Sequence, residues 1–179
     1  MMIDQRKNES AGSRCYSYRR TALHALCYGC LVPHCCSVCC GACRLVNTVD
    51  TWVSQALAVY GEWCEHEVDV YRAILRAGDC AVDVGANVGA FTVPLGRAVG
   101  RSGAVYAFEA QRHLHHLVAA NAALNELYWA WVFHAAVGAE RGSVQVPRAN
   151  YDRPANFGGI SLLDPYWPVA PRELLPRNA

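Results

Sequence analysis

The chain has 179 residues, of which 53% are hydrophobic and 17% charged, and its formal net charge is +1 at pH 7. This length predicts one domain with room for an appendage, since domains usually run to roughly 100–200 residues. Because neither sign of charge dominates, we expect no nucleic acid and no anionic membrane surface as a partner. No stretch has the roughly 20 consecutive apolar residues of a membrane-spanning helix.

The first 48 residues differ from the rest in charge and in cysteine content. They hold six Arg or Lys against two acids, and eight of the ten cysteines lie between Cys15 and Cys43. Residues 17–21 are similar to a twin-arginine export signal, but a cysteine cluster follows them rather than a clean apolar run. A cytoplasmic, reducing location is therefore expected, with thiols rather than disulfides. We expect residues 1–48 to be a basic, cysteine-rich and poorly ordered segment.

Three overlapping C-x-x-C pairs leave a zinc module open as an alternative for this segment. Structural zinc sites usually separate two such pairs by about a dozen residues or more, whereas these pairs crowd together, so we predict no metal site. The composition, with fifteen Arg and one Lys, is also typical of GC-rich coding sequence, and an out-of-frame reading of parts of residues 1–48 and of the tail is a further hypothesis. The pairs are Cys27/Cys30, Cys36/Cys39 and Cys40/Cys43, with His24 and His34 nearby.

From residue 65 onward the hydrophobic pattern alternates between the helical period and short apolar runs. This alternation predicts an α/β fold with right-handed crossovers and a Rossmann-like, three-layer sheet. The predicted helices are 65–76, 90–99 and 111–125. The predicted strands are 80–84, which reads as buried on both faces, then 104–108, 130–137 and a short antiparallel strand at 143–146.

The end of the chain is rich in proline. Pro165, Pro168, Pro171 and Pro176 predict that residues 164–179 form neither a regular helix nor a central strand. We therefore expect a partial domain over 49–163, truncated after the third strand and a short hairpin, and followed by a Pro-rich tail. One sheet edge would then be open, and a partner chain or an oligomer would cover it.

A glycine-rich turn follows the first predicted strand. Residues 83–89 read DVGANVG, with an aspartate at the end of the strand and glycines at 85 and 89. Glu109 lies twenty residues after Gly89, just beyond the second strand, which suits a carboxylate that binds the two ribose hydroxyls of an adenosine ligand. Ligands collect at the carboxyl ends of parallel strands, so both features are predicted to face one cleft.

Two classes of ligand compete for this cleft. A dinucleotide site needs G-x-G-x-x-G, because its second glycine lets the pyrophosphate approach the backbone. Here a pyrophosphate would meet the carboxylate of Asp83 and the side chain of Asn87. A carboxylate at the strand end suits the cationic groups of S-adenosylmethionine (SAM), which has no phosphate. The residues favour SAM, and an NAD-binding Rossmann protein remains the alternative.

From about residue 60 to 162 the chain resembles the FkbM-type class I SAM-dependent methyltransferases. The resemblance rests on YGEWCEHEVD (60–69), VDVGANVGAFTVPLGRAVG (82–100), VYAFEAQ (105–111), the spacing of Asn121 and Asn125, AAVG (135–138) and NFGGISL (156–162). Ala110 departs from the family, which usually has proline there. The resemblance also implies an acceptor half of the sheet after NFGGISL, whose motifs this sequence does not contain.

The resemblance implies transfer of the methyl group of SAM to a hydroxyl of a sugar or small natural product. It implies nine cofactor-binding residues and no identified catalytic residue. Two further alternatives stay open: an inactive fragment, and a non-catalytic SAM-binding or zinc-binding module that needs a partner chain. The implied residues are Asp83, Gly85, Asn87 and Gly89 under the methionine part, Glu109 on the ribose, Ala135 and Ala136 near the adenine, and Tyr60 and Glu62 closing the cleft.

Overall fold

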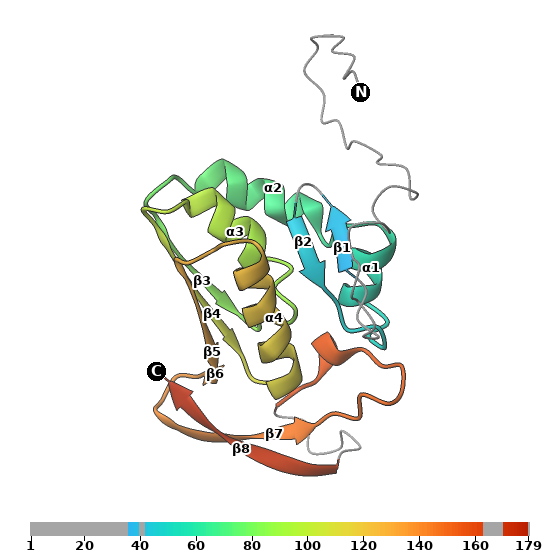
Figure 1. Cartoon of the computed structure of the whole chain (residues 1–179). Coiled ribbons are helices and arrows are strands. Elements are labelled where there is room, and N and C mark those ends of the chain that lie inside the picture. Colours follow the sequence, from blue (N-terminus) through green and yellow to red (C-terminus); the bar gives the residue numbers. More distant parts are fainter. Residues whose placement is uncertain (1–35, 40–41, 163–169, 179) are drawn as a thin grey trace.

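The computed structural model describes residues 36–39, 42–162 and 170–178, and it describes the side chains of 42–162 (Figure 1). The helices are α1 (Val53–Val59), α2 (Glu65–Ile74), α3 (Thr92–Val99), α4 (Arg112–Leu124) and a 3₁₀ turn, Phe157–Gly159. The strands are β1 (Cys36–Cys39), β2 (Ala42–Leu45), β3 (Cys80–Val84), β4 (Ala104–Glu109), β5 (Ala130–His134), β6 (Ala136–Val137), β7 (Gly142–Arg148) and β8 (Ala170–Asn178).

A three-stranded parallel sheet with the order β3-β4-β5 forms the centre of the molecule. Val84 pairs with Phe108, and Glu109 pairs with His134, so the three strands end at one edge. The chain passes from β3 through α3 to β4, and then through α4 to β5. This alternation confirms the predicted α/β, Rossmann-like fold class. In such sheets the ligand crevice lies at the carboxyl ends of the strands, where the predicted site residues are.

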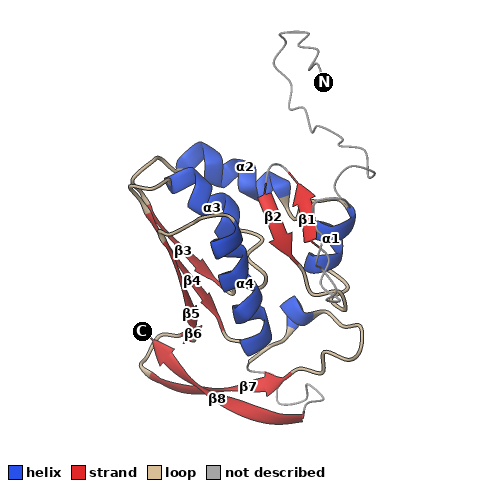
Figure 2. Cartoon of the chain, in the orientation of Figure 1, coloured by secondary structure: helices blue, strands red, loops and turns tan. Residues whose placement is uncertain are grey.

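Helices cover one face of this sheet. Figure 1 shows α3 and α4 on one side of the three strands, with β1, β2 and α1 beyond the helices. Ala81, Val105 and Ala107 point into this helical layer and are buried. Figure 2 shows no helix of the described chain on the other side of the sheet, so the described residues supply two of the three expected layers.

The strand 80–84 is therefore not buried on both faces, as its composition predicts. Its side chains alternate between exposed and buried, and Val82 and Val84 are each 59% exposed. An uninterrupted apolar run is typical of a strand with helices on both sides. This sequence has that composition although the helices of the described residues cover only one side of the strand.

A second, smaller sheet has the order β6-β8-β7, and it corrects two predictions. The predicted strand 130–137 is divided into β5 and β6, which belong to different sheets. The Pro-rich tail, predicted to avoid a central strand, contributes β8 between β6 and β7. β6 pairs with only Arg177 and Asn178, so most of β8 has a neighbour on one side alone. Proline has no N–H to donate, so a strand tolerates it at positions where an N–H would face the unpaired side.

Part of the expected N-terminal segment packs onto the domain. β1 and β2 form an antiparallel hairpin, and Ala42 and Val46 are almost fully buried. The boundary predicted between residues 48 and 49 thus runs through a packed region. The Cys27/Cys30 pair, His24, His34 and Cys40 lie outside the described residues, as do the side chains of Cys36 and Cys39.

Asn121 on α4 joins this N-terminal region to the centre of the fold. Its side chain is fully buried; it accepts a hydrogen bond from the Leu45 N–H at 2.6 Å and donates to the carbonyls of Leu45 (2.8 Å) and Val88 (2.7 Å). One turn later, Asn125 donates to the carbonyl of Cys43 at 2.7 Å. The four-residue spacing places both amides on the helix face that meets β2.

The largest apolar cluster lies between α4, α1 and the glycine-rich turn. It combines Val46, Val53, Leu57, Val88, Leu114 and Phe157, which come from five separate parts of the sequence. No helix within the described ranges is long and apolar enough to cross a membrane.

Replacing Asn121 with Ala is expected to lower the free energy of unfolding by about 3 kcal/mol, because it leaves buried N–H and C=O groups without partners. Urea unfolding measures this loss. Gln55→Ala, at an exposed position on α1, is the control and should change stability by less than about 0.5 kcal/mol. An equal loss in the two variants would contradict the assigned role of Asn121.

Candidate functional site

Two glycines shape the turn after β3 and let other groups approach its backbone closely. Gly85 (φ +80°) and Gly89 (φ +85°) have left-handed backbone conformations, and so does Asn87 (φ +52°). A side chain at Gly89 would also meet Val118 of α4 at 3.1 Å, so this glycine lets the turn pack on the helix. A side chain at Gly85 would meet nothing within 4 Å, so the turn is open to the outside at that point.

The backbone N–H groups of this turn are used within the protein. Gly85 and Ala86 both donate to the carbonyl of Phe108, at 2.9 and 3.0 Å. Gly89 donates to Ala86 at 2.7 Å, and Asn87 donates to Oε2 of Glu109 at 2.7 Å. A phosphate-binding loop needs such groups pointing at the ligand. These four donors are not available for that purpose.

Asp83 lies at the end of β3 on the helical side of the sheet and is 7% exposed. Its Oδ2 accepts a hydrogen bond from the hydroxyl of Thr92 at 2.5 Å, at the start of α3. Burial raises the pKa of this carboxyl, and hydrogen bonds from the Thr92 side chain and backbone oppose that rise. The carboxylate thus already stands at the positive end of the α3 dipole, where a phosphate would otherwise bind.

Glu109 lies at the end of β4 and is 5% exposed. Its two carboxylate oxygens accept from two backbone N–H groups, that of Asn87 and that of Gln111, each at 2.7 Å. Burial raises the pKa of Glu109, these hydrogen bonds oppose the rise, and the nearby charge of Asp83 adds to it. The structure therefore brings together the two carboxylates that the sequence singled out, and Glu109 connects the glycine turn to the loop after β4.

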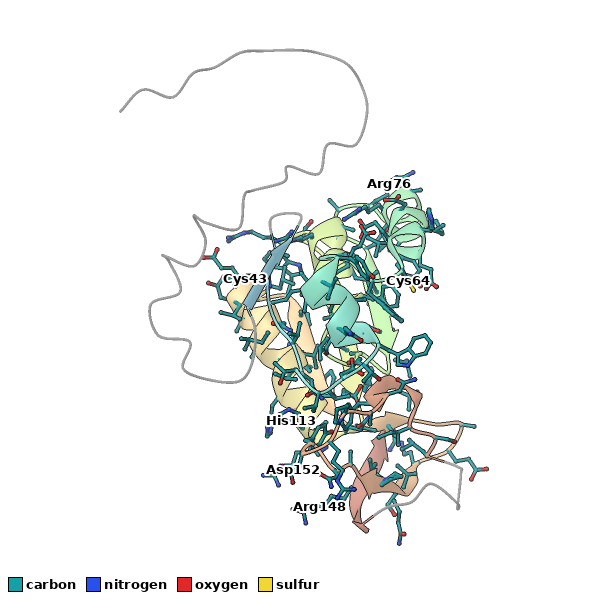
Figure 3. The ribbon with its side chains drawn as sticks, turned by 90° about the vertical axis from the view of Figure 1, so that its right-hand side faces the viewer. Cys43, Cys64, Arg76, His113, Arg148 and Asp152 are labelled. Carbon is teal, nitrogen blue, oxygen red and sulfur yellow. The ribbon has the colours of Figure 1, made fainter. Side chains whose placement is uncertain are left out.

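A segment from much later in the chain packs against Gln111, two residues after Glu109. The amide of Gln111 donates to the Phe157 carbonyl at 2.7 Å and accepts from the Tyr151 hydroxyl at 3.2 Å. The rings of Tyr151 and Phe157 are stacked at 4.7 Å. Burial raises the pKa of Tyr151, and the charge of Glu109 adds to the rise. In Figure 3, His113 at the start of α4 and Asp152 of the later segment lie near each other.

The NFGGISL sequence lies in this segment and reaches the glycine turn. A side chain at Gly158 would meet Nδ2 of Asn87 at 2.9 Å, so a larger residue there would have to displace the Asn87 side chain. Asn156 accepts from the Gly159 N–H at 3.0 Å and fixes the 3₁₀ turn. Two sequence patterns about seventy residues apart are therefore in contact.

Ala135 and Ala136 lie just beyond β5, next to the end of β4, and both are buried. Tyr60 and Glu62 lie elsewhere, on the connection between α1 and α2. Tyr60 is 77% exposed and Glu62 is exposed as well. Neither takes part in the hydrogen bonds described around Glu109, so seven of the nine predicted residues gather at the strand ends and these two stand apart.

Sequence reasoning missed four residues that support this site. Thr92 holds Asp83, Gln111 and Tyr151 surround Glu109, and buried Asp50 accepts from the Phe157 N–H at 3.4 Å. The position of Gln111, two residues after the strand-end carboxylate, is the one signal that could have identified any of them. Asp50 and Tyr151 reach the site only through tertiary packing.

The histidines near the site form ring contacts. His115 stacks with His134 at 5.1 Å, and burial together with the charge of His134 lowers the pKa of His115. Among the described side chains, no three His, Cys, Asp or Glu residues converge as a metal site would require.

No protein-family profile matches the chain, and no curated protein matches it either. The chain is similar to solved methyltransferase structures, at low scores. A protein assigned as an rRNA methylase from Clostridium thermocellum shares 21% identity at a TM-score of 0.39, over 42% of this chain and 41% of its own. A SAM-dependent methyltransferase from Aquifex aeolicus shares 24% identity at a TM-score of 0.35, over 40% and 37%.

A third similar structure is the complex of aTrm5 with tRNALeu, at 21% identity and a TM-score of 0.41, over 53% of this chain and 26% of that one. The matched regions thus span less than half of each of these three proteins. Likeness at this level assigns neither a family nor a substrate.

These structures do correct one prediction, the exclusion of nucleic acid as a partner. That exclusion is wrong, because proteins of similar structure include a tRNA complex and an rRNA methylase. The physical reason is that a net charge near zero averages over the chain. Residues 1–48 alone carry four more basic than acidic side chains, and recognition depends on local charge.

Replacing Thr92 with Val removes the hydroxyl that donates to Asp83 and is expected to cost about 2 kcal/mol of stability at neutral pH. The loss should shrink as the pH falls through the pKa of Asp83, because a protonated carboxyl no longer needs this donor. Urea unfolding at neutral and acidic pH measures both effects. Thr51→Val, at an exposed position, is the control; a loss independent of pH would contradict the assignment.

Proposed function

We propose that this chain binds SAM at the carboxyl ends of β3, β4 and β5 and supports SAM-dependent methyl transfer. The observation that carries the proposal is a pair of buried carboxylates, Asp83 and Glu109, at adjacent strand ends. No Lys, Arg or His among the described side chains forms an ion pair with either of them. The site therefore has a local negative charge that no described side chain neutralises.

This charge favours a cationic ligand over an anionic one. Burial disfavours the ionised form of both carboxyls, and each charge raises the cost of the other. A sulfonium or ammonium group, or a pair of ribose hydroxyls, would stabilise the ionised carboxylates. A pyrophosphate bound at the strand ends would add negative charge next to the two carboxylates.

The hydrogen bonds of the glycine turn support the same choice. The N–H groups of Gly85, Ala86, Asn87 and Gly89 already have acceptors within the protein, and Asp83 stands at the start of α3. A dinucleotide would have to displace these contacts. This argues against the NAD alternative on physical grounds.

The residues present fit SAM in three respects. Oδ1 of Asn87 is buried without a hydrogen-bond partner and would accept from the ammonium group. Gly85 leaves open space at the turn for the methionine part. Glu109 would hold the ribose, and Ala135 and Ala136 would face the adenine. Tyr60 and Glu62 would contribute only by moving toward the cleft, which their exposed position on the α1–α2 connection allows.

When bound, SAM supplies an electrophilic methyl group on a sulfonium. The proposed reaction breaks the bond from sulfur to the methyl carbon and forms a bond from that carbon to an acceptor oxygen, which loses its proton. The protein's part is to position the cofactor in a negative, mostly buried site. We assign no catalytic base, since the described residues at the site hold the cofactor half.

The proposed acceptor is a hydroxyl, as the FkbM-type resemblance implies, and a sugar or small natural product is the class to test first. RNA belongs in the same panel now that nucleic acid is no longer excluded. Residues 49–163 are proposed as the cofactor-binding unit, together with the β1–β2 hairpin that packs on α4.

Calorimetry of the full chain with SAM and with NAD tests the proposal. We expect SAM to bind and NAD not to bind. Glu109→Gln keeps the shape of the side chain but removes its charge and leaves one oxygen to accept from the two backbone N–H groups. It should weaken SAM binding at least about tenfold, the effect of losing roughly 1.4 kcal/mol. Affinity should also fall as the pH drops below the raised pKa of Glu109, because the protonated carboxyl no longer attracts a cation.

Glu126→Gln, an exposed change before the start of β5 and so at the opposite end of the sheet, is the matched control and should leave SAM affinity unchanged. Binding of NAD without SAM would overturn the proposal in favour of the dinucleotide alternative. Equal affinity of wild type and Glu109→Gln would show that the ligand does not contact this carboxylate.

A further inference from the structure

The sheet face opposite α3 and α4 is apolar, and no helix among the described residues covers it; we name it the open face. It carries no charged side chain. Val82 and Val84 are each 59% exposed, Trp131 is 46% exposed, and no helix of the described chain covers them (Figure 2). Parallel sheets are almost always covered on both faces, so this is an unusual surface for a folded chain to show to water. The open face consists of Cys80, Val82 and Val84 on β3, Tyr106 and Phe108 on β4, and Trp131 and Phe133 on β5.

The aromatic rings of the open face are arranged for packing rather than for base stacking. Tyr106 and Trp131 are stacked at 5.3 Å with 18° between their planes, and Phe108 and Phe133 at 5.0 Å with 18°. Each ring thus covers the face of its neighbour. Single-stranded nucleic acid stacks its bases on free ring faces, and here one face of each ring is already covered by its neighbour. The surface favours an apolar protein surface as its partner.

The size of the open face fits one more copy of itself. Val82 and Val84 are each 59% exposed, Trp131 is 46% exposed, Cys80 is exposed and the other three rings are half-buried. With about 200 Å² for an aromatic side chain, the patch leaves roughly 500 Å² of apolar surface in water. Two such patches face to face would remove about 1,000 Å², which is the lower limit for a specific interface.

Its chemistry also permits self-association. With no charge on either surface, two copies meet without repulsion or buried unpaired charge. A two-fold axis in the plane between the sheets would place β4 of one copy over the sheet of the other, as in face-to-face sheet packing. Every contact would then occur twice, which is how symmetric dimers form from one patch.

We propose that the open face is a homodimer interface, in which two copies of this chain pack sheet against sheet. This inference is independent of the proposed methyl transfer, because the open face lies across the sheet from α3 and α4. Cys80 lies on this face, so dimerisation should bury its thiol. Cys64, which is exposed at the start of α2, lies outside the interface and should stay accessible.

Sedimentation equilibrium of the full chain under reducing conditions tests the dimer from low to high micromolar concentration. Val82→Glu places a charge on the β3 side of the open face and should raise the dissociation constant at least about tenfold. The position is exposed in the single copy, so the variant should remain folded. Val70→Glu, a similarly exposed valine on α2, is the matched control and should dimerise like wild type.

Alkylation followed by mass spectrometry of the Cys80 and Cys64 peptides gives a second measurement. Cys80 should become protected as the concentration rises, Cys64 should not, and Val82→Glu should abolish the protection. A monomer at all concentrations would overturn the proposal. So would a monomer with Cys80 always protected, which would assign the face to another segment of this chain. An equal rise of the dissociation constant in Val70→Glu would overturn it as well. So would a wild type that does not self-associate but binds RNA, with that binding lost in Val82→Glu.

Discussion

The carboxylate of Glu109 is the contact on which the site depends. A buried carboxylate is costly unless hydrogen bonds satisfy it, and here two backbone N–H groups do so. One belongs to the glycine turn and the other to the loop that carries Gln111 toward Tyr151 and Phe157. A single side chain thus fixes the relative positions of β3, β4 and the segment around residue 157. The negative charge at the strand ends is a consequence of this same arrangement.

The sequence predicted the parts of the fold that local pattern determines. Helical periodicity located α2, α3 and α4 to within about two residues at most ends. The DVGANVG turn and the distance to Glu109 predicted that two carboxylates would meet, because parallel strands end at a common edge. Those predictions depend on the spacing of residues along the chain, which does not change with the tertiary environment. The nine cofactor contacts themselves stay predictions.

The remaining features depend on tertiary pairing that no local pattern reveals. β8 forms despite its prolines because β7 offers a partner and its other side is largely unpaired. The apolar run of β3 predicts a strand with helices on both faces, but these five residues carry no information about which segment would cover the second face. Asp50 reaches Phe157 across 107 residues of chain and Tyr151 reaches Gln111 across 40, and nothing in their local sequence distinguishes them from ordinary loop residues.

Asn121 has a consequence for the order in which the molecule folds. Its hydrogen bonds join it to residues 76 and 33 positions away, so two long loops must close before they form. The entropy of loop closure is paid before such contacts are gained, which slows folding. The unit β3-α3-β4 consists of nearer neighbours and can assemble first. The hairpin would then dock last, and its loss in a partly folded chain would uncover α4 while leaving the parallel strands paired.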